Sequence, residues 1–237
     1  MKIKSNLSPN FSKKKRKEKA IKFVVIHYTG MQSEIESLNR LTDPKSKVSC
    51  HYLINRKGEV TRLMNDNRIA WHAGRSKWKN FKNLNSNSIG IELVNKGTKF
   101  GYQNFSKLQI KSLIIVCKKL KKKYHINQNN FLGHSDIAPL RKTDPGNKFP
   151  WKKLSAFKIG TWYRIKNLHS KFIDVANVRN SFFKNLYKIG YRYFNLKQSV
   201  KRDKLVVKAF QQRYLPKNVT GRIDKKTLKI SQFLSNS

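Results

Sequence analysis

The segment between Gly133 and Gly146 constrains the fold of this chain more than any other. It reads His-Ser-Asp-Ile-Ala-Pro-Leu-Arg-Lys-Thr-Asp over residues 134–144 and is followed by Pro145. Proline and glycine at these positions argue against one continuous helix. We therefore expect a rigid loop that brings His134 and Asp144 together as half of a metal site, with a further ligand from elsewhere in the chain.

His27 is the best candidate for that further ligand. It follows the apolar run Phe23–Ile26, which is typical of a buried strand. Two neutral imidazoles, one carboxylate and one open position for water make a catalytic zinc set. The sequence therefore predicts one Zn²⁺ per chain, bound by His27, His134 and Asp144.

The stretch Ser88–Val94 predicts a second buried strand with a carboxylate in it. Its branched apolar residues alternate with Gly90 and Glu92, so Glu92 projects from the opposite face. It either faces solvent at a sheet edge or works in a polar cleft, and its dense apolar neighbours favour the cleft. A zinc hydrolase needs a general base and a positive group near the attacked carbonyl. We assign these roles to Glu92 and to Lys142, respectively.

Each of these residues also has an ordinary explanation. A histidine at a strand end is commonly a hydrogen-bonded structural residue. Asp144 before Pro145 can be a turn former, and Lys142 is one lysine among many. Only the joint occurrence of the set favours a metal-dependent hydrolase.

The charge of the chain has two explanations. Its 237 residues carry 53 Lys+Arg against 12 Asp+Glu, a formal net charge of +41. An anionic partner accounts for this balance, and so does compositional drift, because lysines fall in every segment. No DNA or RNA recognition motif occurs, so we expect no specific nucleic-acid partner.

The length predicts one or two domains. Residues 1–20 are polar and basic and are expected to form a flexible, solvated arm. Helical spacing is expected at residues 31–41 and 106–124, and a hairpin at residues 51–64. Residues 161–180 are weakly patterned and serve as the expected domain connection. Residues 181–237 show helical periodicity, with Asp224 as the cap of the last helix.

Several classes of feature are missing from the sequence. Cys50 and Cys117 form no metal-type pair and imply no disulfide framework. No apolar run reaches the length of a membrane span, so we expect no transmembrane segment, and we see no conventional signal peptide. The sequence carries no indication of oligomeric state.

Short motifs in order along residues 20–160 closely resemble one enzyme family, the AmpD/AmiD branch of the zinc N-acetylmuramoyl-L-alanine amidases (amidase type 2, related to peptidoglycan recognition proteins). The motifs are Val25–Thr29, Ser49–Ile54, Trp71–Gly74, Ser88–Asn95, Gly133–Pro139, Lys142–Gly146 and Phe149–Trp151. The resemblance implies an α/β fold, a mixed β-sheet flanked by helices, with zinc at one end of the sheet. It places zinc on His27, His134 and Asp144, and catalytic roles on Glu92 and Lys142.

The resemblance also bears on the surroundings of the site. Some relatives carry cysteine at the position of Asp144, and the aspartate here disfavours a purely recognitional relative. For His51 and His72 we expect either a structural role or substrate contact. The candidates for substrate contact are Cys50, His51, Trp71, His72 and Asn95.

The C-terminal segment resembles a type-1 peptidoglycan-binding domain of three helices. The motifs that carry this resemblance are Ala209–Arg213, Thr220–Asp224, Thr227 and Leu228. We expect residues 181–237 to bind peptidoglycan beside a catalytic domain at residues 21–160. The alternative is a helical cap that only stabilises the catalytic domain, since fold alone does not give function.

The expected reaction is hydrolysis of the amide between N-acetylmuramic acid, or its 1,6-anhydro form, and L-alanine of peptidoglycan stem peptides, in cell-wall turnover or recycling. The alternative is a non-catalytic peptidoglycan-binding or recognition protein. The wall-binding motif favours the bacterial cell envelope (periplasm), whereas the missing signal peptide favours the cytoplasm. The sequence does not distinguish an anhydro-muropeptide substrate from intact polymer.

Overall fold

A mixed β-sheet forms the centre of the larger part of the molecule. The computed structural model describes residues 2–165 and 177–236. The sheet has six strands in the order β1-β5-β4-β9-β3-β10. Strands β10, β3, β9 and β4 run parallel, whereas β5 is antiparallel to β4, so the expected mixed sheet is confirmed. These strands are β1 (Ile3–Ser5), β3 (Phe23–Tyr28), β4 (Tyr52–Ile54), β5 (Val60–Arg62), β9 (Ser88–Leu93) and β10 (Phe131–Gly133).

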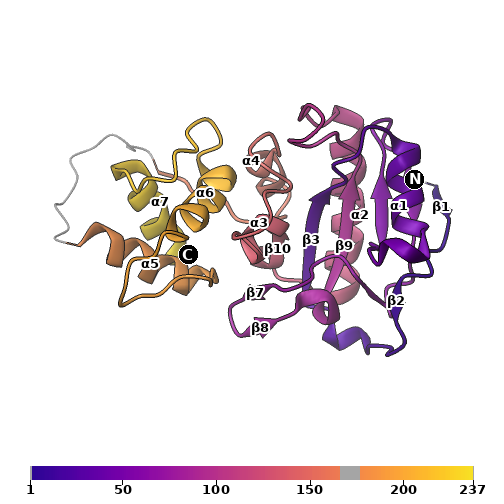
Figure 1. Ribbon diagram of the computed structural model, residues 1–237, viewed down its shortest axis with the longest axis horizontal. Coiled ribbons are helices and arrows are strands. Elements are labelled where there is room, and N and C mark those ends of the chain that lie inside the picture. The colour runs from indigo at the N-terminus through magenta and orange to yellow at the C-terminus, as the bar shows by residue number, and fades with distance from the viewer. Residues whose placement is uncertain (1, 166–176, 237) are drawn as a thin grey trace.

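Helices flank this sheet and form a second, smaller group at one end of the molecule (Figure 1). Two short strand pairs lie outside the sheet: β2 (Phe11–Ser12) with β6 (Ile69–Ala70), and β7 (Lys77–Trp78) with β8 (Phe81–Lys82). The helices are α1 (Glu34–Thr42), α2 (Lys107–Tyr124), α3 (His134–Ile137), α4 (Trp151–Ser155), α5 (Val178–Ile189), α6 (Asp203–Tyr214) and α7 (Lys225–Ser235). None of the helices in the described residues is long and apolar enough to cross a bilayer.

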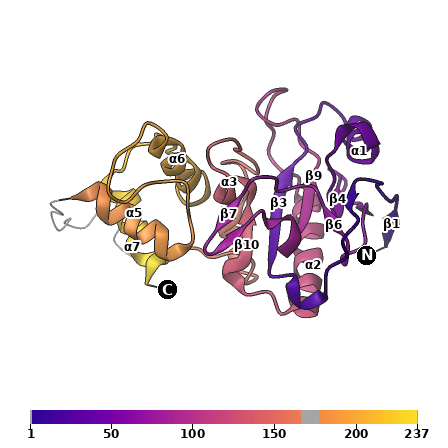
Figure 2. The same cartoon turned by 60° about the horizontal axis from the view of Figure 1, so that its bottom comes forward.

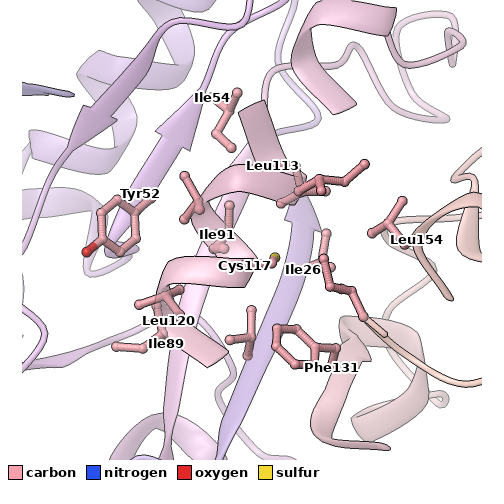
Figure 3. Packing of buried hydrophobic residues seen from close by; sticks show 14 of the residues in the cluster. Ile26, Tyr52, Ile54, Ile89, Ile91, Leu113, Cys117, Leu120, Phe131 and Leu154 are labelled. Atoms are coloured by element: carbon pink, nitrogen blue, oxygen red, sulfur yellow. The ribbon is translucent and has the colours of Figure 1, made fainter. Parts of the chain in front are cut away.

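Helix α2 covers one face of the sheet. Ile26 of β3 and Ile91 of β9 meet Leu113 and Cys117 of α2 in a dry cluster (Figure 3). Because side chains alternate along a strand, the neighbours of these isoleucines point to the other face. The face opposite α2 is therefore the one on which β3 and β9 present polar groups.

The N-terminal segment is not the flexible arm expected from its charge. β1 pairs with β5 and extends the sheet, while β2 pairs with β6. Arg16 is only 8% exposed and donates to the backbone carbonyls of Asp66, Asn85 and Ser88. The expectation for residues 1–20 was wrong because it rested on composition alone. These residues form backbone pairings and hydrogen bonds with segments that are distant in the sequence.

Helices α5, α6 and α7 form the smaller group, which we call the helical module (residues 177–236). Figures 1 and 2 place it beside α3 and β10, at the end of the molecule remote from β1. Asp224 accepts a hydrogen bond from the backbone N–H of Thr227, so the predicted cap is confirmed. The module begins at α5, three residues before the expected boundary, and residues 166–176 of the expected connection lie outside the described residues.

Candidate active site

His27 and Glu92 come from neighbouring parallel strands. Their backbones are register partners between β3 and β9, and both residues lie near the carboxyl ends of these strands. Each follows an isoleucine that points toward α2, so both side chains belong to the opposite face. The sheet thereby places an expected metal ligand and a carboxylate side by side at the edge where open α/β sheets usually bind ligands.

His134 and Asp144 come from the segment that follows β10. His134 begins α3, a single helical turn inside the expected loop. This turn was not expected; it forms because the Asp136 carboxylate accepts the backbone N–H of Gly133, 2.8 Å away. The backbone N–H of Ser135 donates to the carbonyl of Asp144 at 2.8 Å. That bond closes the segment and holds its two expected ligands together.

The three expected metal ligands converge. Nδ1 of His27 lies 2.9 Å from Nδ1 of His134, and Oδ2 of Asp144 lies 3.1 Å from each of these nitrogens. All three side chains are buried. Ligand atoms that share one tetrahedral Zn²⁺ at about 2.1 Å lie about 3.4 Å from one another. The observed spacing is close to that of one ion.

A directional hydrogen-bond chain assigns the tautomer of His27. The Ser88 hydroxyl donates to the carbonyl of Leu84 at 2.6 Å, so its oxygen accepts from Nε2–H of His72 at 3.2 Å. Nδ1 of His72 then accepts from Nε2–H of His27 at 3.0 Å. His27 is left with an unprotonated Nδ1 that faces the other two ligands.

The second histidine has the same arrangement. Nε2 of His134 lies 3.2 Å from the carbonyl of Ala73 and 3.3 Å from the guanidinium of Arg141. When Nε2–H donates to the carbonyl, Nδ1 of His134 is unprotonated. In that tautomer three lone-pair groups face one another at about 3 Å. Such a set is electrostatically unfavourable alone and fits a bound cation.

Electrostatics keep His27 and Asp144 in the protonation states that bind a metal. Burial and the neighbouring His134 lower the pKa of His27 to about 4, so this imidazole is neutral at pH 7. Burial opposes ionisation of Asp144, but His134 and His27 outweigh it and hold the pKa of Asp144 below its usual range. Neutral imidazoles with an ionised carboxylate are the forms that bind a metal.

Glu92 lies in the same cavity with one free oxygen. Its Oε2 is buried and has no hydrogen-bond partner among the described residues. Burial, reinforced by the charge of Asp144, raises the pKa of Glu92 to about 8, against the opposing charge of Lys142. A bound cation would lower the pKa of Glu92, as Lys142 does, and bring this pKa closer to neutral pH, where a general base works best.

The cavity around these groups has a volume of about 350 Å³. Its lining includes His27, Glu92, His134 and Asp144, with Lys142 on the same segment as Asp144. Trp71 and His72 also line it, which agrees with their expected place near the substrate. The lining contains two arginines that sequence reasoning missed, Arg40 and Arg141.

The sequence contained weak indications that these two arginines lie near the site. Arg141 directly precedes Lys142, and its guanidinium donates to the backbone carbonyls of Ala73 and Arg75. It thereby joins the ligand-bearing segment to the loop that follows Trp71. Arg40 stands three residues after Ser37 in α1, a helical spacing that places both on the face lining the cavity.

Three expected substrate contacts are not brought into the cavity. Cys50 is fully buried, and its thiol donates to the carbonyl of Tyr52. Asn95 is 1% exposed and holds a turn by accepting the N–H of Gly97 and donating to the carbonyl of Gln103. These polar atoms form hydrogen bonds with the backbone, and neither residue lines the cavity.

His51 has the structural role, which was one of the two roles expected for it. It is fully buried, its Nδ1 accepts the N–H of Gly90, and its Nε2 donates to the carbonyl of Arg68. The guanidinium of Arg16 lies 2.8 Å from Nε2. His51 therefore links the N-terminal segment to the central strand β9.

Sequence comparisons agree with this geometry. The family model described as N-acetylmuramoyl-L-alanine amidase (Amidase_2) matches residues 17–147. N-acetylmuramoyl-L-alanine amidase AmiD of Escherichia coli K12 is 34% identical over 229 residues, which cover 90% of this chain and 82% of AmiD. 1,6-anhydro-N-acetylmuramyl-L-alanine amidase AmpD of Haemophilus influenzae is 34% identical over 170 residues, which cover 64% of this chain and 90% of AmpD.

Solved structures of amidases also have a similar fold. E. coli AmiD, in complex with its substrate anhydro-N-acetylmuramic acid-L-Ala-D-γ-Glu-L-Lys, matches with a TM-score of 0.81 at 32% identity, covering 95% of this chain and 91% of AmiD. AmpDh3 of Pseudomonas aeruginosa matches with a TM-score of 0.81 at 28% identity, covering 98% and 94%. The chain belongs to the N-acetylmuramoyl-L-alanine amidase family.

Proposed function

We propose that this protein is a zinc-dependent amidase that hydrolyses the bond between N-acetylmuramic acid, or its 1,6-anhydro form, and L-alanine of peptidoglycan stem peptides. One observation carries the proposal. Three possible ligand atoms of His27, His134 and Asp144 converge in the cavity that also contains Glu92, whose Oε2 has no hydrogen-bond partner among the described residues. Hydrolysis requires both a metal site and a general base, whereas recognition of peptidoglycan requires neither. The presence of both in this family member therefore favours hydrolysis.

The chain's own side chains supply the remaining chemistry. Zn²⁺ held by His27, His134 and Asp144 would polarise the scissile carbonyl and make water more acidic. Glu92 accepts the proton of the attacking water and then donates it to the departing alanine nitrogen. The ammonium group of Lys142 stabilises the negative charge that develops on the carbonyl oxygen. No covalent intermediate with the protein is needed.

Charge supports a muropeptide as the substrate. Stem peptides carry carboxylates, and the cavity lining contains the cations Arg40, Arg141 and Lys142. A cavity with this charge raises the local concentration of an anionic ligand.

Mass spectrometry of muropeptide digests tests the proposal. The protein should release free stem peptides from N-acetylmuramyl peptides, and a chelator should stop the release. Asp144→Ala should lose both zinc and hydrolysis, since the site then has only two ligands. Binding of muropeptides without any cleavage by zinc-loaded protein would favour the recognition alternative instead.

We further propose that the helical module contacts the wall polymer and that the protein acts in the cell envelope. The support is the resemblance of Ala209–Arg213 and Thr220–Asp224 to a wall-binding domain. The full chain carrying Asp144→Ala should cosediment with purified peptidoglycan, and cell fractionation should recover the protein with the envelope. Recovery in the cytoplasmic fraction alone would contradict this location.

A further inference from the structure

The carboxylate of Asp136 connects the metal-binding segment to the helical module. Asp136 lies two residues after His134 in α3 and is 1% exposed. Its Oδ2 accepts the backbone N–H of Gly133 and the guanidinium of Arg213, and its Oδ1 accepts the hydroxyl of Tyr191 at 2.6 Å. Two of its three donors therefore belong to the helical module rather than to the α/β part.

Arg213 also contacts the backbone and a side chain on either side of this segment. Its second guanidinium nitrogen donates to the carbonyl of Phe131 at 3.1 Å, at the start of β10. The guanidinium carbon lies 3.9 Å from the ring centroid of Trp151, the first residue of α4. One buried side chain of α6 thus touches the strand before His134, the helix that contains it, and the helix after Asp144.

Apolar packing fixes the module in this position. Trp78 of β7 meets the ring of Tyr191 edge-on, with the ring centroids 4.9 Å apart. Gly190 lies so close to Trp78 that a Cβ at position 190 would be 2.5 Å from the indole. The backbone N–H of Lys79 donates to the carbonyl of Gly190 at 2.8 Å. The Asp136 cluster is therefore sealed from water between the two parts.

Beyond the Asp136 cluster, the segment is held by the guanidinium of Arg141 and by the buried side chain of Ile137. Helix α3 is a single turn, so its own backbone bonds hold it weakly. Since Ser135 N–H is bonded to the Asp144 carbonyl, a displacement of α3 moves the ligands His134 and Asp144 together, relative to His27 on the rigid strand β3.

We propose that Arg213 and Tyr191 are positioning residues for the metal-binding segment, so that the helical module completes the catalytic site in addition to any contact with the wall. This inference rests on the proposed metal site. It assigns the two residues no contact with substrate; they act through Asp136 on the placement of His134 and Asp144.

Zinc affinity, measured by competition with a chromogenic chelator in the absence of substrate, tests the proposal. Tyr191→Phe removes one hydroxyl, and Arg213→Met removes the guanidinium while keeping an unbranched apolar side chain. We expect zinc affinity to fall about tenfold in the first variant and about 10- to 100-fold in the second, the range found when a group that orients a ligand is lost. In zinc-saturated protein, kcat should fall while KM stays unchanged, because neither residue touches substrate.

Arg179→Met is the matched control. Arg179 pairs with Asp203 inside the module, at 3.0 Å through Nε, and makes no contact with the metal-binding segment. This variant should lose thermal stability but keep the zinc affinity of the parent. Arg213→Lys, which keeps the charge but loses the planar fork, should fall between the parent and Arg213→Met.

The outcomes separate the possibilities. Unchanged zinc affinity in both Tyr191→Phe and Arg213→Met would overturn the proposal, as would an equal loss in Arg179→Met, which would indicate only general destabilisation. If Arg213→Met does not fold, Tyr191→Phe decides, since it deletes a single oxygen. If zinc affinity follows the expected pattern but the parent protein cleaves no muropeptide, the positioning role stands and the proposed function fails.

Discussion

His72 accepts a hydrogen bond from His27 through an Nε2–Nδ1 pair 3.0 Å apart, with the two rings at 82° to each other. The position is possible because residue 90 is glycine: a Cβ there would collide with the His72 ring. The pair fixes both the tautomer and the rotation of His27, although His72 itself is not a ligand.

We therefore expect His72→Leu to lower zinc affinity about 10- to 100-fold, since the acceptor that orients His27 is lost. His72→Asn should recover part of the affinity, because an amide oxygen can take the place of Nδ1. Chelator competition measures both. Equal affinities in the two variants would show that the ring is needed only to fill space.

Glu92→Gln should keep zinc and lose hydrolysis. The amide cannot accept the proton of water, so we expect kcat to fall by at least about 10²-fold, the usual contribution of a general base. Zinc content by atomic absorption and turnover of a muropeptide give the two readouts. Glu18→Gln, at an exposed glutamate paired with Lys123, is the control and should match the parent. Normal turnover by Glu92→Gln would remove this residue from the mechanism.

Lys142→Met should leave zinc affinity nearly unchanged and lower kcat about 10²- to 10³-fold, which is typical of the loss of one group that stabilises an oxyanion. Lys142→Arg keeps the charge and should retain part of the rate. Lys152→Met removes an exposed lysine of α4 outside the cavity lining and controls for the change in net charge. A rate for Lys142→Met equal to that of the control would contradict the assignment.

Because His51 is buried, we expect the free energy of unfolding to fall in acid. Burial and the charge of Arg16 lower its pKa from 6.5 to about 3. Below pH 6.5 the unfolded chain therefore binds a proton that the folded chain excludes, so the free energy of unfolding falls as pH falls from 6.5 to 3. One such group contributes up to about 1.4 kcal/mol per pH unit.

Urea unfolding of metal-free protein at several pH values checks this slope. His51→Gln has no titratable ring, so its free energy of unfolding should decline less steeply with acid than that of the parent. The difference between the two slopes isolates His51 from the other histidines. Parallel slopes would mean that His51 is protonated in the folded state.

Arg16 should prove to be a core residue despite its basic surroundings. Arg16→Met leaves the buried carbonyl of Ser88 and the partly buried carbonyls of Asp66 and Asn85 without this donor. We expect a loss of about 3 kcal/mol in the free energy of unfolding, at about 1–3 kcal/mol for a buried group left unsatisfied. Lys14→Met, at an exposed lysine of the same segment, should change stability by less than about 0.5 kcal/mol. Equal effects would support a solvated arm.

Local pattern in the sequence was sufficient to predict much of the site. The alternation in Ser88–Val94 placed Glu92 on the face opposite the buried isoleucines, and the apolar run before His27 predicted the strand that carries it. The motifs around His134 and Asp144 predicted the two side chains that converge with His27. These predictions succeeded because the period of a strand and the order of motifs are properties of neighbouring residues.

Only the tertiary structure decided which distant groups meet. The register of β3 and β9 sets His27 beside Glu92. Arg16 finds carbonyls 50 to 72 residues further along the chain, and Asp136 finds Tyr191 and Arg213, 55 and 77 residues away. No local periodicity encodes such contacts, because they depend on how the chain closes around its core. For this reason composition and motifs predicted neither the ordered N-terminal segment nor the buried contacts of Asp136 with the helical module.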